Sequence, residues 1–307
     1  MILKSASVLK MAFAAMAAFG QAPAKDGVFV PDKPIECPNC AAWNAPHTPF
    51  RIYGNSYYVG PAGLASVLIA TKDGLVLIDG GLPQSALVIL DNIRALGFQP
   101  ADIKLILNSH IHYDHAGGIA ALRMVSGARV AASAPSAKAL ALGHATADDP
   151  QYGFVSAATN YAPVDKVDLV EDGQVLTVGD VAFTAHLTPG HTPGGTSWTW
   201  QSCEAGRCLN MVYADSLTAV SDDSFHFTGD ANHASRVEGF RASIAKIAAL
   251  PCDVLMTPHP DFFQMEEKLA ARKANPKTNP FIDPGACAAY AAGASAALDQ
   301  RIADEKK

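Results

Sequence analysis

The sequence predicts an α/β fold, specifically a four-layer α/β/β/α sandwich. The prediction rests on the order of the expected strands and helices. Short runs rich in β-branched and aromatic residues come in two blocks, and residues with helical periodicity follow each block. Strands and then helices, twice over, favour two packed sheets covered by helices over one parallel sheet of alternating strands and helices. With 307 residues, 49% of them hydrophobic, the chain can bury such a core without metal or disulfide support.

The first block follows a Pro-rich arm that we expect to be irregular through Pro49. Gly and Asn separate its first four strands, as in an antiparallel meander, and these strands are predicted at residues 50–53, 56–59, 64–70 and 75–78. The block continues with a helix at 83–96, a strand at 103–107, a helix at 117–125 and a strand at 129–132. Residues 133–162 are poor in β-branched side chains and favour a helix followed by a polar loop near a functional edge.

The second block is rich in strands and ends in helices. Its strands are predicted at 167–170, 175–178, 181–186, 196–201 and 209–213, followed by helices at 234–249 and 288–303 with a strand at 253–257 between them. The chain has no short internal repeat and no Gly-rich phosphate-binding loop. These absences argue against a solenoid and against a nucleotide-binding fold.

The N-terminus has the pattern of a secretory signal peptide. Lys4 and Lys10 precede the apolar run at 11–19, and the small residues around Ala22-Pro23-Ala24 suit a cleavage region. A membrane anchor is the alternative, but the run is about half of the ~20 residues that a span needs, so no stable membrane insertion is expected.

Three parts of the chain are therefore expected. Residues 1–24 form a signal peptide, 25–48 an N-terminal arm and 49–307 the catalytic domain, and the mature protein is periplasmic or secreted.

Six cysteines in an exported chain favour disulfides. Cys203 and Cys208 flank a short polar turn, where a bridge would join adjacent strands, and Cys252 with Cys287 would tie the C-terminal helix to the core.

The remaining two cysteines lie in Cys37-Pro38-Asn39-Cys40. They could form a local disulfide, a redox pair or half of a zinc site. We favour the disulfide, because the chain has no second Cys-x-x-Cys motif to complete a four-cysteine site.

The charge of the chain excludes one class of partner. The formal net charge is -6, and no local Lys/Arg cluster offsets it, so we expect no nucleic acid partner. An anionic small substrate would have to be held by local groups.

The strongest chemical signal is His110-Ile111-His112-Tyr113-Asp114-His115, directly after the predicted strand at 103–107. Histidines two positions apart project to the same side only in an extended chain, so His110 and His112 could bind one metal while Asp114 and His115 turn toward a neighbouring position. Four donors within six residues suit two metals better than one. Imidazole and carboxylate without thiolate favour zinc, although iron or manganese would accept the same set.

Two further histidines lie where they could complete the ligand sets. His191 lies in a Pro/Gly-rich turn after the predicted strand at 181–186, and His259 lies in Thr257-Pro258-His259-Pro260 after an apolar strand. Isolated histidines are more often surface or hydrogen-bonded residues. The five that we do not assign as ligands are His47, His144, His186, His226 and His233.

The cluster, the Pro189-Gly190-His191 turn and Pro258-His259 resemble the metallo-β-lactamase superfamily, over roughly Pro49 to Tyr290. The resemblance implies the α/β/β/α sandwich of this superfamily and a site with two zinc ions. The superfamily also includes glyoxalase II-type thioesterases, lactonases, arylsulfatases, phosphodiesterases and nucleases, so the cluster alone does not name a substrate.

Narrower features resemble the subclass B3 β-lactamases. They are Tyr213-Ala214-Asp215-Ser216-Leu217-Thr218-Ala219, Ile52-Tyr53-Gly54-Asn55 with Tyr58-Val59-Gly60, Trp198-Thr199-Trp200, Pro150-Gln151-Tyr152-Gly153, and the pairs Cys203/Cys208 and Cys252/Cys287.

This resemblance implies that the first zinc is bound by His110, His112 and His191, and the second zinc by Asp114, His115 and His259. It also implies that Ser216 and Thr218 hold the substrate carboxylate, while Gln151 lines the entrance.

Two aspartates have alternative readings. Thioesterase-like relatives use a Gly-Asp-x-Leu segment whose aspartate bridges both metals, and Asp215 can be aligned with it; we prefer Ser216 facing the site, with Asp215 supporting the ligands from outside. Asp79 ends an apolar strand. It is either a turn-forming residue or an acceptor that orients the metal-binding loop.

The resemblance implies hydrolysis of β-lactams, and with it antibiotic resistance. A hydroxide held by two zinc ions, roughly 3.5–4 Å apart in such sites, would attack the β-lactam carbonyl, and Asp114 would orient it as well as bind metal. We expect a monomer acting on a small-molecule β-lactam. The alternatives are an exported dizinc thioesterase or lactonase, and a non-catalytic zinc-binding domain.

Overall fold

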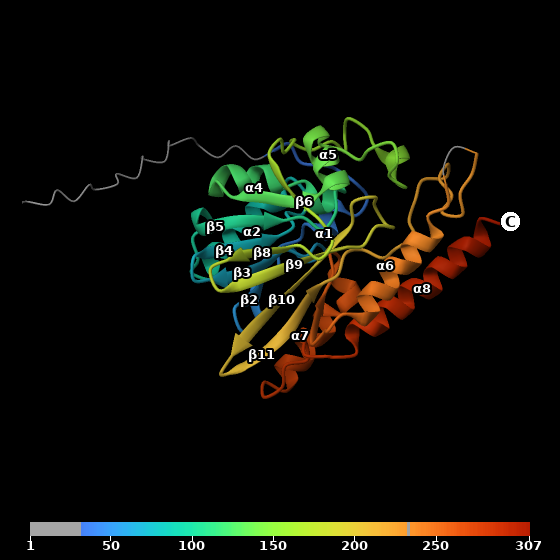
Figure 1. Cartoon of the computed structure of the whole chain (residues 1–307). Helices are drawn as coiled ribbons and strands as arrows, with labels where there is room; N and C mark the ends of the chain where they lie inside the picture. Colours follow the sequence, from blue (N-terminus) through green and yellow to red (C-terminus); the bar gives the residue numbers. More distant parts are fainter. Residues whose placement is uncertain (1–31, 232–233) are drawn as a thin grey trace, which may run out of the picture. The chain divides into compact units, whose positions relative to one another are not determined.

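The computed structural model describes residues 32–231 and 234–307. The predicted signal peptide at 1–24, residues 25–31 of the arm, and His233 lie outside the described residues. Two sheets form the centre of the described part, and helices cover them (Figure 1). The predicted four-layer α/β/β/α sandwich is confirmed.

The first sheet has seven strands in sequence order. They are β1 (Phe50–Tyr53), β2 (Ser56–Tyr58), β3 (Val67–Thr71), β4 (Gly74–Ile78), β5 (Ile103–Leu107), β6 (Arg129–Ser133) and β7 (Val167–Val170). Strands β1 to β4 form the predicted antiparallel meander. Strands β4 to β7 pair in parallel, which the sequence analysis did not foresee.

Helical crossovers make the second half of this sheet parallel, because parallel neighbours need a long connection. The connecting elements are α2 (Ser85–Ala95), η1 (Pro100–Asp102), α3 (Tyr113–Ala116), α4 (Ile119–Ser126), α5 (Ala134–Leu142) and η2 (Tyr152–Phe154). Helix α2 buries Ile89, Leu90 and Ile93 on one face, and Gly97, with φ +86°, follows its C-terminal end.

The second sheet has five strands, in the order β12-β11-β10-β9-β8. They are β8 (Val175–Val178), β9 (Val181–Leu187), β10 (Thr196–Glu204), β11 (Arg207–Tyr213) and β12 (Val254–Met256). Neighbours are antiparallel except β11 and β12, which pair in parallel because α6 (Val237–Ala249) connects them.

Helices α6 and α8 (Ala286–Asp304) pack side by side on the part of the molecule that contains the second sheet (Figure 1). Between β12 and α8 lie η3 (Pro260–Phe263) and α7 (Met265–Ala274), and α7 was missed from the sequence. Its sequence, MEEKLAARKA, lacks an apolar face, and only Met265 and Lys268 are buried. Hydrophobic periodicity therefore gave no signal for it.

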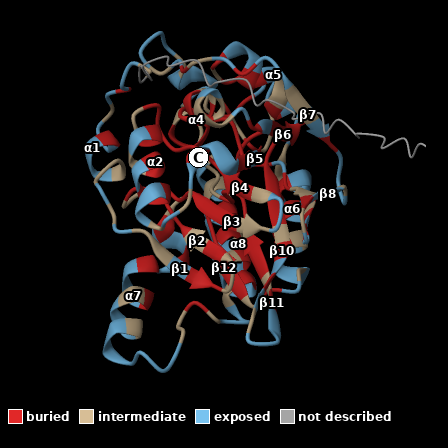
Figure 2. Ribbon diagram, turned by 90° about the vertical axis from the view of Figure 1, so that its left-hand side faces the viewer, coloured by how far each residue is buried: buried red, intermediate tan, exposed pale blue. Residues whose placement is uncertain are grey.

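The core lies between the two sheets, where the strands carry most of the buried residues (Figure 2). Residues Val181, Phe183 and Ala185 of β9 alternate with more exposed neighbours, as expected for a strand with one buried face. Strand β5 is buried almost throughout, because helices cover its other side. Trp198 and Tyr213 are among the largest fully buried side chains.

All six cysteines are paired, as Cys37–Cys40, Cys203–Cys208 and Cys252–Cys287. The second bridge joins facing residues of β10 and β11. The third joins the segment before β12 to α8. These are the pairs that the sequence predicts.

The N-terminal arm is more regular than the sequence predicts. It contains one helical turn, α1 (Cys40–Trp43), which the adjacent Cys37–Cys40 disulfide constrains. The side chain of Gln84 donates to the carbonyl of Ile35 over 2.8 Å and accepts from its backbone N–H over 3.1 Å, so the arm is fixed to the domain.

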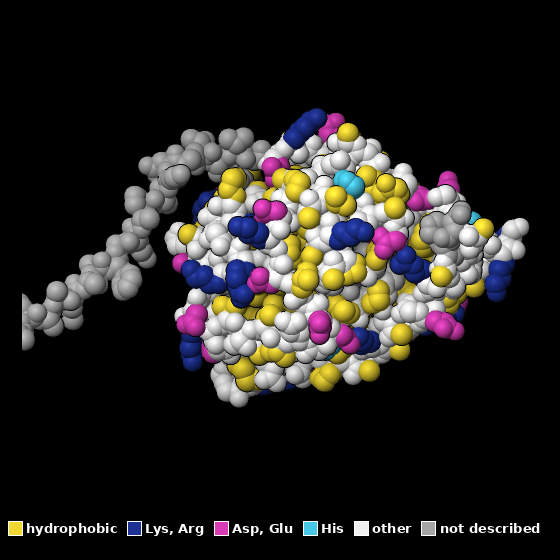
Figure 3. All heavy atoms as spheres, turned by 45° about the horizontal axis from the view of Figure 1, so that its top comes forward, with side chains coloured by type: hydrophobic (Ala, Val, Ile, Leu, Met, Phe, Trp, Pro, Cys, Tyr) yellow, Lys and Arg dark blue, Asp and Glu magenta, His cyan; other side chains and the backbone are white. Residues whose placement is uncertain are grey.

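Charged side chains of both signs lie on the surface. On the face in Figure 3, basic and acidic side chains are interspersed rather than gathered into one basic patch. None of the helices in residues 32–231 and 234–307 is long and apolar enough to cross a membrane.

Candidate metal centre

The histidine cluster begins where β5 ends, and its backbone changes conformation within it. The chain is still extended at His112, with φ -63° and ψ 148°, and α3 then begins at Tyr113. Asp114 and His115 lie in this short helix, and Asp114, His115 and His259 form a group separate from that of His110, His112 and His191. The extended stretch followed by a turn, expected from the spacing, therefore separates the four donors into two pairs.

His191 joins the first pair. Ligand atoms of His110, His112 and His191 all lie within 4.8 Å of one another, and all three residues are buried. The ring centroids of His191 lie 4.9 Å from His110 and 4.8 Å from His112. Nε2 of His110 is buried without any hydrogen-bond partner in the described part of the chain, which is costly unless a ligand satisfies it.

His259 joins the second pair. Oδ2 of Asp114 lies 3.2 Å from Nε2 of His115 and 3.4 Å from Nε2 of His259, and the two nitrogens are 3.2 Å apart. A tetrahedral zinc ion with ligands about 2.0–2.1 Å away requires ligand atoms about 3.3 Å apart. These three side chains therefore fit one metal ion without rearrangement.

Electrostatics favour the metal-binding protonation state at some of the candidate ligands, whereas, against the lowering effect of burial, Asp149 raises the pKa of His112 and Asp114 that of His259. Burial and the neighbouring histidines lower the pKa of His110 well below its usual value and that of His191 to about 3, so both imidazoles are neutral. Burial alone would raise the pKa of Asp114, but the adjacent His115 and His259 bring it well below its usual value. Neutral imidazole and ionised carboxylate are the forms that ligate metals.

Asp215 supports His110 from behind. Its Oδ1 lies 2.7 Å from Nδ1 of His110, and both side chains are fully buried. Because Nδ1 is engaged by Asp215, Nε2 is the ring nitrogen left to face the metal group. Gly195 lies so close to Asp215 that a Cβ there would collide with Oδ2. This placement differs from that of a carboxylate lying between two metal positions.

Thr218 supports His191 in a similar way. Nδ1 of His191 lies 2.8 Å from the backbone oxygen of Thr218 and 3.0 Å from its Oγ1. The ring therefore presents Nε2 to His110 and His112. Thr218, predicted as a substrate contact, also holds a candidate ligand.

Asp149 supports His112, and the sequence analysis missed it. Its Oδ1 lies 3.1 Å from Nε2 of His112 and accepts from the backbone N–H of Gln151 over 2.8 Å. Asp149 is 1% exposed, although it lies in the loop between α5 and β7. The pair of acidic residues at the start of this polar loop was the only signal in the sequence, and it did not indicate which residue turns inward.

Asp79 holds the start of the loop that carries the histidine cluster. It does not hold the side chain of a candidate ligand. It accepts from the backbone N–H of Ser109 over 2.8 Å, from Oγ of Ser109 over 2.6 Å, and from the hydroxyl of Tyr213 over 2.9 Å. Burial raises its pKa to about 7, against the lowering effect of these hydrogen bonds. Its backbone has φ +59°, a strained conformation for a residue with a side chain.

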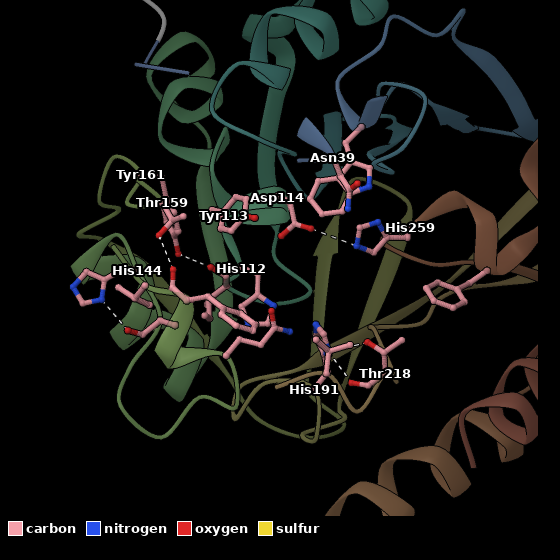
Figure 4. A pocket seen from close by; sticks show the side chains of 18 of the residues that line it. Asn39, His112, Tyr113, Asp114, His144, Thr159, Tyr161, His191, Thr218 and His259 are labelled. Atoms are coloured by element: carbon pink, nitrogen blue, oxygen red, sulfur yellow. Dashed lines mark hydrogen bonds and ion pairs between the residues drawn. The ribbon is translucent and has the colours of Figure 1, made fainter. Parts of the chain in front are cut away.

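A cavity of about 470 Å³ opens beside both groups, and His112, Asp114, His191 and His259 line it (Figure 4). Aromatic and apolar side chains form much of its wall. Phe154 of η2 and Tyr161 come from the loop that the sequence places near a functional edge, whereas Trp43 of α1 and Phe262 of η3 come from segments that the sequence did not connect with the site.

Two of the three predicted substrate contacts line the cavity, and the third does not. Gln151 and Thr218 line the cavity, whereas Ser216 is 2% exposed and is not among its lining residues. The described residues that line the cavity include no lysine or arginine.

The other histidines within the described residues join neither group. His144 lines the cavity, but its Nδ1 lies 2.8 Å from the backbone oxygen of Ala145. His47 pairs with Glu266, His186 lies 2.9 Å from Oγ1 of Thr199, and His226 lies 3.9 Å from Asp230.

Comparison with known proteins agrees with the geometry. Residues 59–205 match the metallo-beta-lactamase superfamily model. The solved structure of Rm3 metallo-beta-lactamase is 51% identical, covers 89% of this chain and 100% of its own, and superposes with a TM-score of 0.85. MEM-A1, a subclass B3 metallo-beta-lactamase from a soil metagenome library, is 45% identical, with coverage of 86% and 98% and a TM-score of 0.82.

A curated relative carries a different activity. The hydroxyacylglutathione hydrolase of Anaeromyxobacter dehalogenans is 30% identical over 197 residues, which are 64% of this chain. The match spans 59% of that enzyme's length. Because similarity to the Rm3 structure extends over its whole length at much higher identity, the chain is a hydrolase of the metallo-β-lactamase superfamily, with subclass B3 enzymes among its structural neighbours.

Proposed function

We propose that this chain hydrolyses the amide bond of β-lactams, namely penicillins, cephalosporins and carbapenems, with two zinc ions. One observation carries the proposal: two groups of three metal-ligating side chains lie beside a single cavity. The likeness to Rm3 and MEM-A1 supports the choice of substrate.

The proposed ligands follow the two groups. His110, His112 and His191 would hold the first zinc ion, and Asp114, His115 and His259 the second. Zinc supplies Lewis acidity when bound and lowers the pKa of a coordinated water toward about 7. With water as the nucleophile, the chain needs no nucleophilic side chain, and its residues position the reactants.

Asp114 has two proposed tasks. One carboxylate oxygen faces His115 and His259, and the ionised group can accept a hydrogen bond from the attacking water and so orient it. Its depressed pKa keeps it an acceptor at neutral pH.

Thr218 and Gln151 are the better-placed substrate contacts. Both line the cavity and can donate hydrogen bonds to the substrate carboxylate. Ser216 is buried, so a direct contact with substrate would need its segment to move. Since no lysine or arginine is among the described lining residues, the positive charge that attracts an anion would come from the metals.

We further propose that the protein acts as a monomer in the periplasm or after secretion, and that it confers antibiotic resistance. Three disulfides are consistent with an oxidising compartment.

A zinc thioesterase or lactonase is the second candidate, and the likeness to hydroxyacylglutathione hydrolase favours it. The position of Asp215 speaks against it, since this carboxylate engages Nδ1 of His110 instead of lying between the two groups. A non-catalytic zinc-binding domain is disfavoured because structural zinc sites are normally closed by four protein ligands.

A substrate panel tests the proposal. Zinc-loaded protein should hydrolyse a chromogenic cephalosporin, a penicillin and a carbapenem, lose activity to a chelator and regain it with zinc. A thioester and an acyl lactone, assayed in parallel, should turn over at least tenfold more slowly. Faster turnover of either one than of every β-lactam would select the second candidate.

A further inference from the structure

A second cavity, of about 390 Å³, lies behind the wall of the main one. Helix α8, η3 and the start of α7 surround it, and its lining is mainly apolar, with Leu255, Phe263 and Ala294 among the buried side chains. Thr218 and Phe262 line both cavities, so the two are neighbours. Nothing in the proposed reaction uses this second space.

One charged side chain stands out in this apolar setting. Lys268 lines the cavity and is 9% exposed, yet its ammonium group makes no hydrogen bond or ion pair with any residue in 32–231 or 234–307. Burial lowers its pKa, which the charge of Asp283 partly opposes. An ammonium group without a protein partner in this apolar setting would gain a charge-assisted hydrogen bond from an anionic ligand.

Asp283 does not fill this role. It also lines the cavity, but it is exposed to solvent and its Oδ1 accepts from the backbone N–H of Gly285 over 3.0 Å. Asp283 therefore compensates the positive charge of Lys268 only in part.

We propose that this second cavity binds an amphipathic carboxylate, a fatty acid of about ten carbons, with its chain among the apolar side chains and its carboxylate on Lys268. The size agrees, because 390 Å³ corresponds to about 13 groups of ~30 Å³ each, and decanoate has about 12 non-hydrogen atoms. A pocket of this volume with an apolar lining and one charged group is typical of small-molecule sites.

The occupant would lie against the segment that supports the metal centre. The hydroxyl of Tyr290, which lines the second cavity, accepts from the backbone N–H of Leu217 over 3.0 Å and donates to the carbonyl of Asp215 over 3.1 Å. Metals bind carboxylates too, so a test must separate binding beside Lys268 from binding at the metal centre.

Calorimetric titration of the metal-loaded protein with decanoate makes this separation. Lys268→Met keeps an apolar side chain of similar length and removes the charge, and we expect at least tenfold weaker binding, the loss typical of a charge-assisted hydrogen bond. Ala289→Leu, at an exposed position of the lining, should weaken binding similarly by filling the mouth. Decan-1-ol, which has no charge, should bind wild type and Lys268→Met equally.

Lys273→Met is the matched control, since Lys273 is an exposed lysine of the same helix and should leave decanoate affinity unchanged. Decanoate binding that persists in both Lys268→Met and Ala289→Leu but disappears when metal is removed would locate it in the main cavity and overturn the proposal. Absence of decanoate binding to wild type would overturn it as well. Neither result depends on β-lactam turnover.

Discussion

At the scale of single residues, each of the three histidines in the first group is oriented by a neighbour outside the ligand set. Asp215 engages Nδ1 of His110, and Asp149 engages Nε2 of His112, so opposite ring nitrogens of the two histidines are left for the metal. A partner of this kind fixes the tautomer and ring orientation of a ligating histidine.

Replacement of Asp149 should weaken the first metal site selectively. Asp149→Ala leaves His112 free to rotate, and loss of such a partner typically reduces metal affinity by about 10–100-fold. Asp149→Asn, which keeps a hydrogen-bond acceptor, should recover part of this loss. Zinc affinities of the metal-free proteins, measured with a competing chromogenic chelator, check the prediction.

The control for Asp149 is Asp148→Ala. Asp148 is its neighbour in the same loop, and within residues 32–231 and 234–307 its one polar contact is from the backbone oxygen to Arg236. Equal loss of affinity in the Asp148 and Asp149 variants would mean that the loop, and not the carboxylate, is what matters.

Asp79 should give the fold a distinctive pH dependence. Its pKa is about 7 in the folded protein against 3.8 ordinarily, so the folded state holds this proton more tightly than the unfolded chain does. The contribution of Asp79 to stability therefore falls as pH rises from about 4 to 7 and then levels off.

Asp79→Asn removes that titration. Between pH 5 and pH 8, the free energy of unfolding of metal-free wild type should fall by on the order of 2 kcal/mol more than that of Asp79→Asn. Urea denaturation of both proteins at the two pH values measures the difference. Parallel pH profiles would show that Asp79 keeps an ordinary pKa.

Residue spacing indicates which candidate ligands the fold brings together, but it does not indicate their supporting partners. His-x-His-x-Asp-His is a local pattern, whereas the contact between His112 and Asp149 joins residues 37 positions apart through a folded loop. The sequence places Asp215 outside the ligand set by resemblance alone. The structure shows which atom of His110 it contacts, namely Nδ1.

At the scale of elements, the candidate ligands lie where strands end. The first cluster follows β5, His191 lies in the turn between β9 and β10, and His259 follows β12. Strands are rigid supports, and the turns after them present side chains without burying backbone groups.

Elements with strong hydrophobic patterns are predictable from this sequence, and those shaped by context are not. β5 and β7 were predicted with the bounds that the structure shows. Helix α7 lacks an apolar face, and α3 has only four residues, too few for a helical periodicity to show in the sequence. The parallel half of the first sheet depends on long-range pairing that the local pattern does not specify.

The disulfides should differ in their effect on stability. Cys252–Cys287 closes a loop with a sequence separation of 35, and Cys203–Cys208 one with a separation of 5. Loop-closure entropy assigns them about 4 and 2 kcal/mol, respectively. The double serine variant at 252 and 287 should therefore melt at a lower temperature than the one at 203 and 208. A reversed order in calorimetry would mean that strain or packing outweighs entropy here.

At the scale of the whole molecule, each metal group draws on both halves of the described chain. The first combines two residues after β5 with His191 of the second sheet, and the second combines Asp114 and His115 with His259. Metal binding should therefore stabilise the association of the two sheets as well as supply chemistry.

Two zinc ions held by six residues are the centre of the proposed activity. The most direct measurement titrates zinc into the metal-free protein and records, in the same samples, bound zinc per chain and hydrolysis of a chromogenic cephalosporin. We predict saturation at two ions per chain, with turnover that rises as the ions bind. Protein that carries two zinc ions per chain and leaves penicillins, cephalosporins and carbapenems intact would contradict the proposed function.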